Sequence, residues 1–267
     1  LKMLRFYDPN KNRLVYLGRA ASSEFWDEQW SSLQATKQIE KKRNPLITGK
    51  TKKYLPIGSR VLEGGCGRGE YVYLLGKSGF STIGIDFAKK TVKKINELYP
   101  NLDIRFGDIK NMDFDDGFFD GYWSFGVIEH FYDGYEDVVT EMCRVLKPQG
   151  FLFIIVPTMS PLRKYFSKKG KYPIWEHENH DVDKFYQFAL DANKIVTDFE
   201  NGGFKLREMR PYGGLKGFKD EVTFLKPVLQ PIFDSQNIFI KAIKIFLDFV
   251  LQPIAAHTTL FVFQKNE

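Results

Sequence analysis

Short apolar runs alternate with amphipathic segments through the middle of the chain. The apolar runs have the length of buried strands and cover residues 60–63, 81–86, 102–106, 119–125 and 151–156. Between them, apolar positions three or four residues apart predict helices over 70–77, 88–98 and 138–146. Strands that alternate with helices in this way predict an α/β fold with a doubly wound, mostly parallel sheet. The last run is apolar throughout, which favours a strand buried on both faces.

The segments on either side of this region are less regular. Residues 22–39 carry Phe25, Trp26, Trp30 and Leu33 at roughly helical spacing, with Ser22 or Ser23 as N-cap. Beyond the fifth strand, the pattern predicts a loop over 157–181, a helix over 183–199, a strand over 204–209, a helix over 238–250 and a terminal strand over 258–263. We therefore expect a helical N-terminal extension over 1–56 that covers the substrate. A domain over 57–267 follows, with a helical insertion at about 213–255 before its last strand.

A glycine-rich turn follows the first predicted strand. Gly65, Gly67 and Gly69 stand at alternate positions after the acidic strand end Glu63. Glycine lets the backbone pass close to a ligand, because a side chain there would collide with it. Glycine patterns also occur in purely structural turns. The strand before this turn and the helix after it favour a ligand site.

Two aspartates follow the next two strands. Asp86 ends the second strand, where an acidic residue accepts hydrogen bonds from both ribose hydroxyls of a nucleoside cofactor. The alternative is that Asp86 only caps the helix that follows. Asp108 comes after the third strand, so its carboxylate could accept from an adenine amino group while Ile109 packs on the ring. Taken by itself, Asp108 would more often be a turn residue.

Together these features resemble the class I S-adenosylmethionine-dependent methyltransferases, especially the type 11 family. The resemblance spans about residues 59–156 and is carried by Val61 to Gly69, Ile83 to Asp86, Gly107-Asp108, Phe119 to His130 and Arg144 to Gly150. It implies a Rossmann-like sheet of seven strands with the last strand antiparallel. It also implies S-adenosyl-L-methionine as cofactor and S-adenosyl-L-homocysteine as product.

The resemblance further implies which residues hold the cofactor. Glu63, Gly65 and Gly67 would contact its methionine part, Asp86 its ribose, Asp108 and Ile109 its adenine, and Ser124 and Phe125 would line it from the fourth strand. Their neighbours complete the expected site, namely Gly64, Cys66, Gly69 and Phe87. Gly64 stands where the family usually has a branched apolar residue, so we expect a looser strand end. Gln149 replaces a common glycine, a change expected to be neutral.

Glu129 and His130 lie just past the fourth strand and are the catalytic candidates. Ligands of such folds bind at the carboxyl edge of the sheet, where this pair falls. Histidine titrates in the range that suits deprotonation of a hydroxyl, so His130 could be a general base. The family resemblance gives His130 mainly a pocket-lining role, and methyl transfer depends chiefly on alignment of the reacting groups.

A second cluster of polar and aromatic residues spans 175–181. Its His177 and His180 are expected to contact the substrate, and a helix-capping role is the alternative for His180. The spacing matches no standard metal site, so no metal is expected. Tyr212 precedes a glycine-rich hinge at 213–217 and is a third candidate for substrate contact.

Composition adds limited information about partners and surroundings. The net charge of +6 and the pI near 9.0 permit an anionic partner without identifying one. Two isolated cysteines, Cys66 and Cys143, favour a reduced, cytoplasmic setting. The first nine residues lack the apolar run of a signal peptide, and no stretch reaches the roughly 18 apolar residues of a spanning helix.

The insertion is strongly apolar, with lysines interspersed. Residues 219–251 could therefore make peripheral contact with a membrane or roof an apolar pocket. Core packing or homodimer formation is the alternative that we favour.

The family fold fixes the methyl donor and leaves the acceptor open. The leading hypothesis is O-methylation of a small molecule or a glycan, including a lipid-linked one. An RNA methyltransferase is second because of the net charge, but nucleic acid is not the expected partner, since the chain lacks the motifs of base-directed enzymes. A non-catalytic S-adenosylmethionine-binding scaffold is third, and the set of Glu63, Asp86 and Asp108 argues against it.

Overall fold

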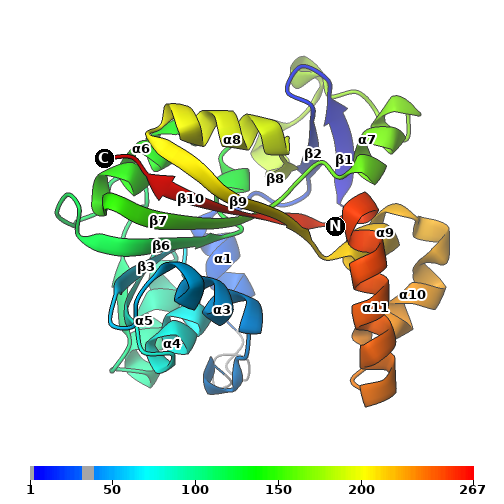
Figure 1. The fold of residues 1–267 in the computed structure, drawn as a ribbon. Helices are drawn as coiled ribbons and strands as arrows, with labels where there is room; N and C mark the ends of the chain where they lie inside the picture. The colour runs from blue at the N-terminus through cyan, green and yellow to red at the C-terminus, as the bar shows by residue number, and fades with distance from the viewer. Residues whose placement is uncertain (1–2, 32–38) are drawn as a thin grey trace.

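The computed structural model describes residues 3–31 and 39–267, which form two β-sheets with flanking helices (Figure 1). The larger sheet has seven strands in the order β5-β4-β3-β6-β7-β10-β9. They are β3 (Arg60–Gly64), β4 (Ser81–Asp86), β5 (Asp103–Phe106), β6 (Phe119–Phe125), β7 (Leu146–Pro157), β9 (Phe204–Tyr212) and β10 (Thr258–Lys265). Only β10 runs antiparallel to its neighbours β7 and β9. The predicted fold class is confirmed.

Helices cover both faces of this sheet because its central strands are apolar on both sides. On β6, Tyr122 packs into one core and its neighbour Trp123 into the other, and β7 alternates in the same way at Ile154 and Phe153. One face carries α6 (Glu136–Val145) and α8 (Ala192–Asn201). The other face carries α3 (Pro45–Tyr54), α4 (Glu70–Lys77) and α5 (Lys89–Leu98).

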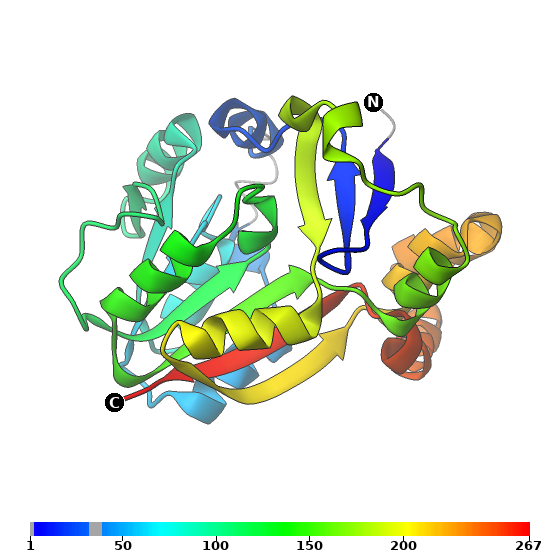
Figure 2. The same ribbon diagram turned by 90° about the horizontal axis from the view of Figure 1, so that it is seen from above.

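The smaller sheet lies beside the larger one and has the order β1-β2-β8 (Figure 2). Its strands are β1 (Leu4–Asp8), β2 (Arg13–Leu17) and β8 (Phe185–Ala189). The N-terminal extension is therefore not wholly helical, because it opens with a hairpin whose turn places Asn12 at a φ of 46°. The predicted helix over 183–199 is wrong in its first half, because β8 pairs with β2 and only 192–201 is helical.

The rest of the extension contains the predicted helix in shorter form. Helix α1 (Ser23–Gln29) begins at the expected place, with the Ser22 side chain accepting from the Phe25 N–H. Of the part predicted to continue to Ile39, residues 32–38, Leu33 among them, lie outside the described residues. The predicted loop over 157–181 contains α7 (Pro161–Lys168), capped by Ser160. Short 3₁₀ turns lie at Ile39–Lys41, Ile128–His130, His177–Asn179, Val182–Lys184 and Thr223–Leu225.

The insertion before the last strand is helical, as expected, and it extends beyond the sheet (Figure 1). It comprises α9 (Gly214–Glu221), α10 (Lys226–Asp234) and α11 (Ile238–Ala255). The expectation that its apolar residues pack in the core is wrong for much of α11, where Phe239 and Phe246 are 78% and 65% exposed. In the described part of the chain, no helix has both the length and the apolar content needed to cross a bilayer.

Candidate active site

A cavity of about 270 Å³ opens at the carboxyl ends of β3, β4 and β6. Seven of the residues selected from the sequence line it together, namely Gly65, Asp86, Phe87, Asp108, Ile109, Phe125 and His130. The other lining residues are Ala21, Trp26, Trp30, Lys110, Gly126, Val127 and Phe131. Parallel strands bring residues distant in sequence to one edge, so the site is assembled by the sheet.

The glycine-rich turn borders this cavity through Gly65. Gly65, Gly67 and Gly69 have φ values of 72°, 50° and 70°, in the left-handed region that favours glycine. The N–H groups of Gly65 and Cys66 both donate to the Ile85 carbonyl, which ties the turn to the adjacent strand. A Cβ on Gly65 would lie 2.6 Å from a methyl of Val127. Glycine is thus required by both backbone conformation and space.

Asp86 connects this turn to the next strand–helix junction. One carboxylate oxygen accepts from the Gly67 N–H at 2.7 Å, and the other accepts from the Ala88 N–H at 2.8 Å. Burial raises the pKa of Asp86 above its ordinary value. A carboxylate has about four acceptor sites, so two remain for a ligand. Asp86 therefore holds Ala88, the residue before the first turn of α5, but does not cap the helix itself, and it still lines the cavity.

Asp108 and Ile109 form the far wall of the cavity. Asp108 is exposed and accepts from the Lys110 N–H at 2.9 Å, as a turn aspartate does, while Ile109 is buried. Phe87, beside Asp86, is 43% exposed and also lines the cavity. The Asp108 carboxylate, the Ile109 side chain and the Phe87 ring thus face the cavity together on this side.

Six of the expected cofactor residues lie in, behind or beside the turn and do not line the cavity. Glu63 is buried and accepts from the Val72 N–H at 3.0 Å, and burial raises its pKa well above the ordinary value. The others are Gly64, Cys66, Gly67, Gly69 and Ser124, all of them buried. Ser124 places its hydroxyl where it has no hydrogen-bond partner among the described residues. Direct contact of these six residues with a cofactor stays a prediction.

The expected looseness at Gly64 is not found. A Cβ on Gly64 would lie 1.8 Å from the hydroxyl of Tyr122 and 2.5 Å from its Cζ. The Tyr122 ring therefore fills the place where a branched side chain would stand. The strand end is closely packed, and the glycine and the tyrosine depend on each other.

Two tryptophans that the sequence-based site assignment missed cover the cavity from α1. The Trp26 and Trp30 rings stack with centroids 5.6 Å apart at 15°. A Cβ on Gly67 would lie 3.1 Å from the Trp30 ring, and the Arg68 guanidinium lies 5.0 Å from that ring's centroid. The four-residue spacing of the tryptophans was the available signal, since it places both on one face of a helix.

Side chains of α1 hold it against the start of α5. Asp27 accepts from the Thr91 N–H at 2.8 Å and from the Thr91 hydroxyl at 2.9 Å. Ser23 donates its hydroxyl hydrogen to the Phe87 carbonyl at 3.1 Å. The N-terminal extension is thus a cover whose attachment lies next to Asp86.

The two catalytic candidates have different surroundings. Glu129 is buried, its Oε2 has no partner in the described part of the chain, and burial raises its pKa to about 8. His130 lines the cavity with Trp26 edge-on at 5.2 Å, and burial lowers its pKa to about 4. Its Nδ1 lies 2.5 Å from the Tyr186 carbonyl, which can only accept. Nδ1 therefore carries the proton, and Nε2 is an unprotonated acceptor at neutral pH.

The three expected substrate residues lie away from the cavity. His180 stacks on Trp175 with centroids 4.8 Å apart and contacts Phe6 at 4.1 Å. His177 lies 5.9 Å from the Tyr132 ring, and Tyr212 ends β9 at the far edge of the sheet. Among the described residues, no group of three or more His, Cys, Asp or Glu is arranged to hold a metal ion.

Comparisons with known proteins agree with the resemblance to S-adenosylmethionine-dependent methyltransferases. Residues 62–154 match the family model described as "Methyltransferase domain". The chain is 30% identical over 151 residues to a probable S-adenosylmethionine-dependent methyltransferase of Mycolicibacterium smegmatis, covering 57% of this chain and 54% of that protein. It is 31% identical over 158 residues to the tRNA (carboxymethyluridine(34)-5-O)-methyltransferase of Arabidopsis thaliana, covering 58% and 34%. The chain thus spans about half or less of these curated relatives.

A solved structure has the same fold at low identity. A chain in the complex of the Haloferax volcanii Trm112 methyltransferase activator with a methyltransferase aligns with a TM-score of 0.57. Identity is 17%, and the alignment covers 91% of this chain and 98% of the other. At this identity the likeness concerns the fold and not the substrate.

Proposed function

This chain carries a class I S-adenosylmethionine-dependent methyltransferase domain of the type 11 family, and from that premise we propose that it methylates an oxygen atom of a small molecule or a glycan. The observation that carries the proposal is His130, a neutral imidazole in the wall of the cavity whose Nε2 is an unprotonated acceptor.

The residues around the cavity fit the expected cofactor. The glycine turn offers close backbone approach, Asp86 retains acceptor capacity for a ribose diol, and Asp108 with Ile109 suits an adenine. S-adenosylmethionine, when bound, supplies a methyl group on a sulfonium that an oxygen nucleophile attacks in line. The chain's own contribution is to bind and orient both partners in a site covered by Trp26 and Trp30.

His130 would hold the hydroxyl of the acceptor. As the acceptor oxygen bonds to the methyl carbon and the bond from that carbon to the sulfonium sulfur breaks, the hydroxyl proton would become strongly acidic and pass to Nε2. A base with a pKa of about 4 is sufficient for this late proton transfer, and it stays unprotonated at neutral pH. The Tyr186 carbonyl holds the ring in the required tautomer.

RNA methylation is the second candidate, because several relatives are named as tRNA methyltransferases or probable tRNA methyltransferases. The lysines of the N-terminal extension give it little support, since three of them are neutralised by carboxylates within the protein. Lys42 pairs with Glu70 at 2.7 Å, and Lys50 and Lys53 both pair with Glu208. Such pairs leave less positive charge for phosphates.

The first test is isothermal titration calorimetry of S-adenosylmethionine with the purified chain. We expect binding, and we expect Asp86→Asn to weaken it by on the order of tenfold or more, as loss of a charged hydrogen-bond acceptor does. Asp103→Asn is the matched control, because Asp103 is exposed and, within residues 3–31 and 39–267, its only ion pair is with Arg105. No binding by the wild-type chain would refute the proposal.

The second test identifies the acceptor. Cell extracts incubated with the enzyme and methyl-labelled cofactor would be analysed by mass spectrometry, with and without prior ribonuclease treatment. A labelled small molecule or glycan that disappears with His130→Ala supports the proposal. Label confined to ribonuclease-sensitive material would favour the RNA alternative, and cofactor binding without any labelled product would favour a scaffold.

A further inference from the structure

Helix α11 presents an unusually apolar side to the surroundings. We define its outward face as Ile238, Phe239, Ile243, Ile245, Phe246 and Phe249, which are between 51% and 78% exposed. With 3.6 residues per turn these positions span about 160° of the helix circumference, and no charged residue of α11 falls among them. Contiguous exposed apolar surface of this kind marks an interaction site.

The polar half of α11 faces the protein, so the outward face cannot simply turn inward. Asp248 accepts from the Leu215 N–H at 3.1 Å, Lys244 donates to the Phe233 carbonyl at 2.6 Å, and Gln252 donates to the Pro211 carbonyl. Rotating the helix would break all three contacts.

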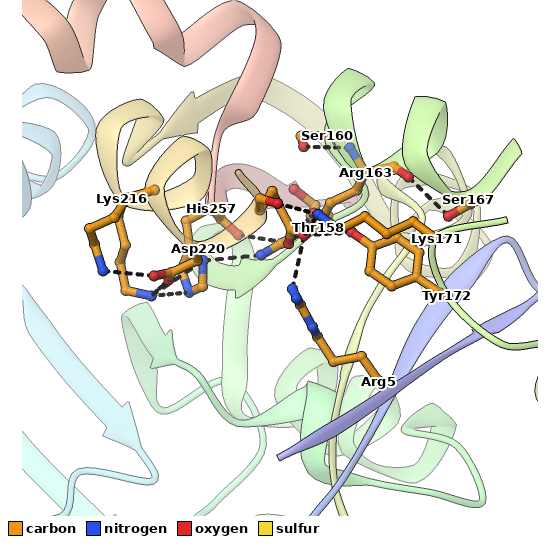
Figure 3. Close-up of polar contacts among 12 residues, drawn as sticks. Arg5, Thr158, Ser160, Arg163, Ser167, Lys171, Tyr172, Lys216, Asp220 and His257 are labelled. Carbon is orange, nitrogen blue, oxygen red and sulfur yellow. Dashed lines mark hydrogen bonds and ion pairs between the residues drawn. The ribbon is translucent and has the colours of Figure 1, made fainter. Parts of the chain in front are cut away.

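Helix α9 holds α11 at close range. A Cβ on Gly214 would lie 2.2 Å from the Gln252 nitrogen, and one on Gly217 would lie 1.8 Å from the Ala255 oxygen. At the other end of α9, Glu221 pairs with the buried Arg163 at 2.9 Å. Figure 3 shows how Arg163 also reaches Thr158 and His257, which fixes α9 to the strands. These contacts hold α11 with its outward face exposed.

Positive charge adjoins this face. Lys241 lies about 40° from its edge on the helix wheel, and Lys226 starts α10 between the exposed Phe224 and Val228. Neither lysine forms an ion pair with a carboxylate in the part of the chain that the structure describes. Anionic headgroups would supply the missing countercharge, whereas the same face of a second copy would bring further lysines.

Helices α10 and α11 form a helical hairpin, and its turn favours a position on the surface of a bilayer over penetration into it. The turn between α10 and α11 carries Asp234, Ser235 and Asn237, which are polar and would resist burial in hydrocarbon. A helix of this kind lies in the interface plane with its apolar face among the acyl chains.

The helical hairpin of α10 and α11 is also connected to the edge of the sheet at which the cavity lies. Strand β10 is antiparallel to both β7 and β9, so β9 is parallel to β7 and ends at the carboxyl edge, at Tyr212. Helix α9 follows directly from that end. A surface that engages α11 would thus lie toward the edge where Asp86 and His130 stand.

We propose that the chain binds the surface of an anionic lipid bilayer through the outward face of α11, with Lys226 and Lys241 at headgroup level. This binding is independent of the acceptor and of the proposed methyl transfer.

The test is flotation of the purified full chain with phosphatidylcholine vesicles, with and without phosphatidylglycerol. We expect flotation with the anionic vesicles, and a loss on the order of tenfold or more in the triple variant Phe239→Ser, Phe246→Ser, Phe249→Ser. The matched control is Ile57→Ser, Ile174→Ser, Met209→Ser, which changes three apolar residues of 46% to 62% exposure elsewhere. Lys226→Gln with Lys241→Gln should reduce the preference for anionic lipid.

Cofactor calorimetry on the triple variant separates this proposal from the proposed function, since binding of S-adenosylmethionine should be unchanged. Sedimentation velocity tests the alternative occupant of the outward face, which is a second copy of the chain. A wild-type dimer that dissociates in the triple variant, together with no flotation, would overturn the proposal in favour of a second copy. Equal flotation of the wild-type chain and the triple variant would overturn it as well.

Discussion

The carboxylate of Asp27 accepts a hydrogen bond from the backbone N–H of Thr91, 2.8 Å away, and so caps a helix to which it does not belong. Helix α5 begins after Ala88, whose side chain cannot cap it. Asp27 supplies the missing acceptor from α1, at the positive end of the α5 dipole. Helix α1, which covers the cavity, is thereby attached to the first turn of α5.

Asp27→Ala should loosen this cover and weaken cofactor binding. Loss of a cap costs about 1 kcal/mol, which corresponds to a roughly fivefold increase in Kd if closure of α1 accompanies binding. Calorimetry with S-adenosylmethionine measures the effect. Glu28→Ala is the control, since Glu28 is the next residue of α1 and its only ion pair among the described residues is with Arg19 on the surface. Equal affinities in the two variants would contradict the role of Asp27.

Gly64→Ala should destabilise the fold through packing and not through backbone strain. Its Cβ would lie 1.8 Å from the Tyr122 hydroxyl, and overpacking in a closely packed core typically costs about 1–3 kcal/mol. Tyr122→Phe should rescue Gly64→Ala only in part, because the Cζ contact at 2.5 Å remains. Urea unfolding of the two single variants and the double variant measures the coupling. Additive losses would show that the two residues do not depend on each other.

The parts of the site that could be predicted are those with local signals. The glycine turn, Asp86 and Asp108 each follow a strand that the apolar runs reveal, and a parallel sheet brings strand ends together without further information. The Asp27–Thr91 contact joins residues 64 positions apart, with no motif to mark it. The helical spacing of Trp26 and Trp30 predicts a helix at α1. Nothing in the sequence predicts that this helix docks on the start of α5.

The wrong prediction of a helix in the first half of 183–199 has a similar cause, a contact between distant segments. Phe185, Phe188 and Phe199 suit a helical period, and the pairing of β8 with β2 is a contact between distant segments that overrides it. The local sign of the boundary is Asp191, which caps α8 by accepting from the Asn193 and Lys194 N–H groups. Pairing partners of short strands are decided by tertiary structure, so they are the least predictable part of this fold.

Glu129 should make stability depend on pH. Burial raises its folded pKa to about 8, above the ordinary value of 4.5, so the folded state retains a proton that the unfolded state releases. The free energy of unfolding should therefore fall as pH rises from about 4.5 to about 8, with a contribution of about 1.4 kcal/mol per pH unit. Glu129→Gln removes this slope, and urea unfolding at several pH values measures it. Glu136→Gln, at an exposed site, should keep the wild-type slope.

Glu221→Gln should strongly destabilise the protein, because Glu221 balances several buried or half-buried cations. Its carboxylate lies 2.9 Å from both Arg163 and Arg5, and it accepts from the Tyr172 hydroxyl at 2.5 Å. Burial raises its pKa, but the two arginines outweigh this and hold the pKa below the ordinary value. Figure 3 shows Arg5, Arg163 and Tyr172 converging from separate elements. Removing one partner of a buried pair costs about 3–5 kcal/mol, since it leaves the other charge uncompensated.

Urea unfolding of Glu221→Gln measures this loss, with Glu28→Gln as the control. Glu28 also pairs with an arginine, but both side chains are exposed, so its loss should lie within about 1 kcal/mol of the wild-type chain. Because Glu221 ends α9, on which α11 rests, the variant should also increase hydrogen exchange over α9 and α11 before global unfolding. Glu221→Gln with the stability of Glu28→Gln and unchanged exchange would show that α9 is held by its glycine contacts and not by the ionic cluster.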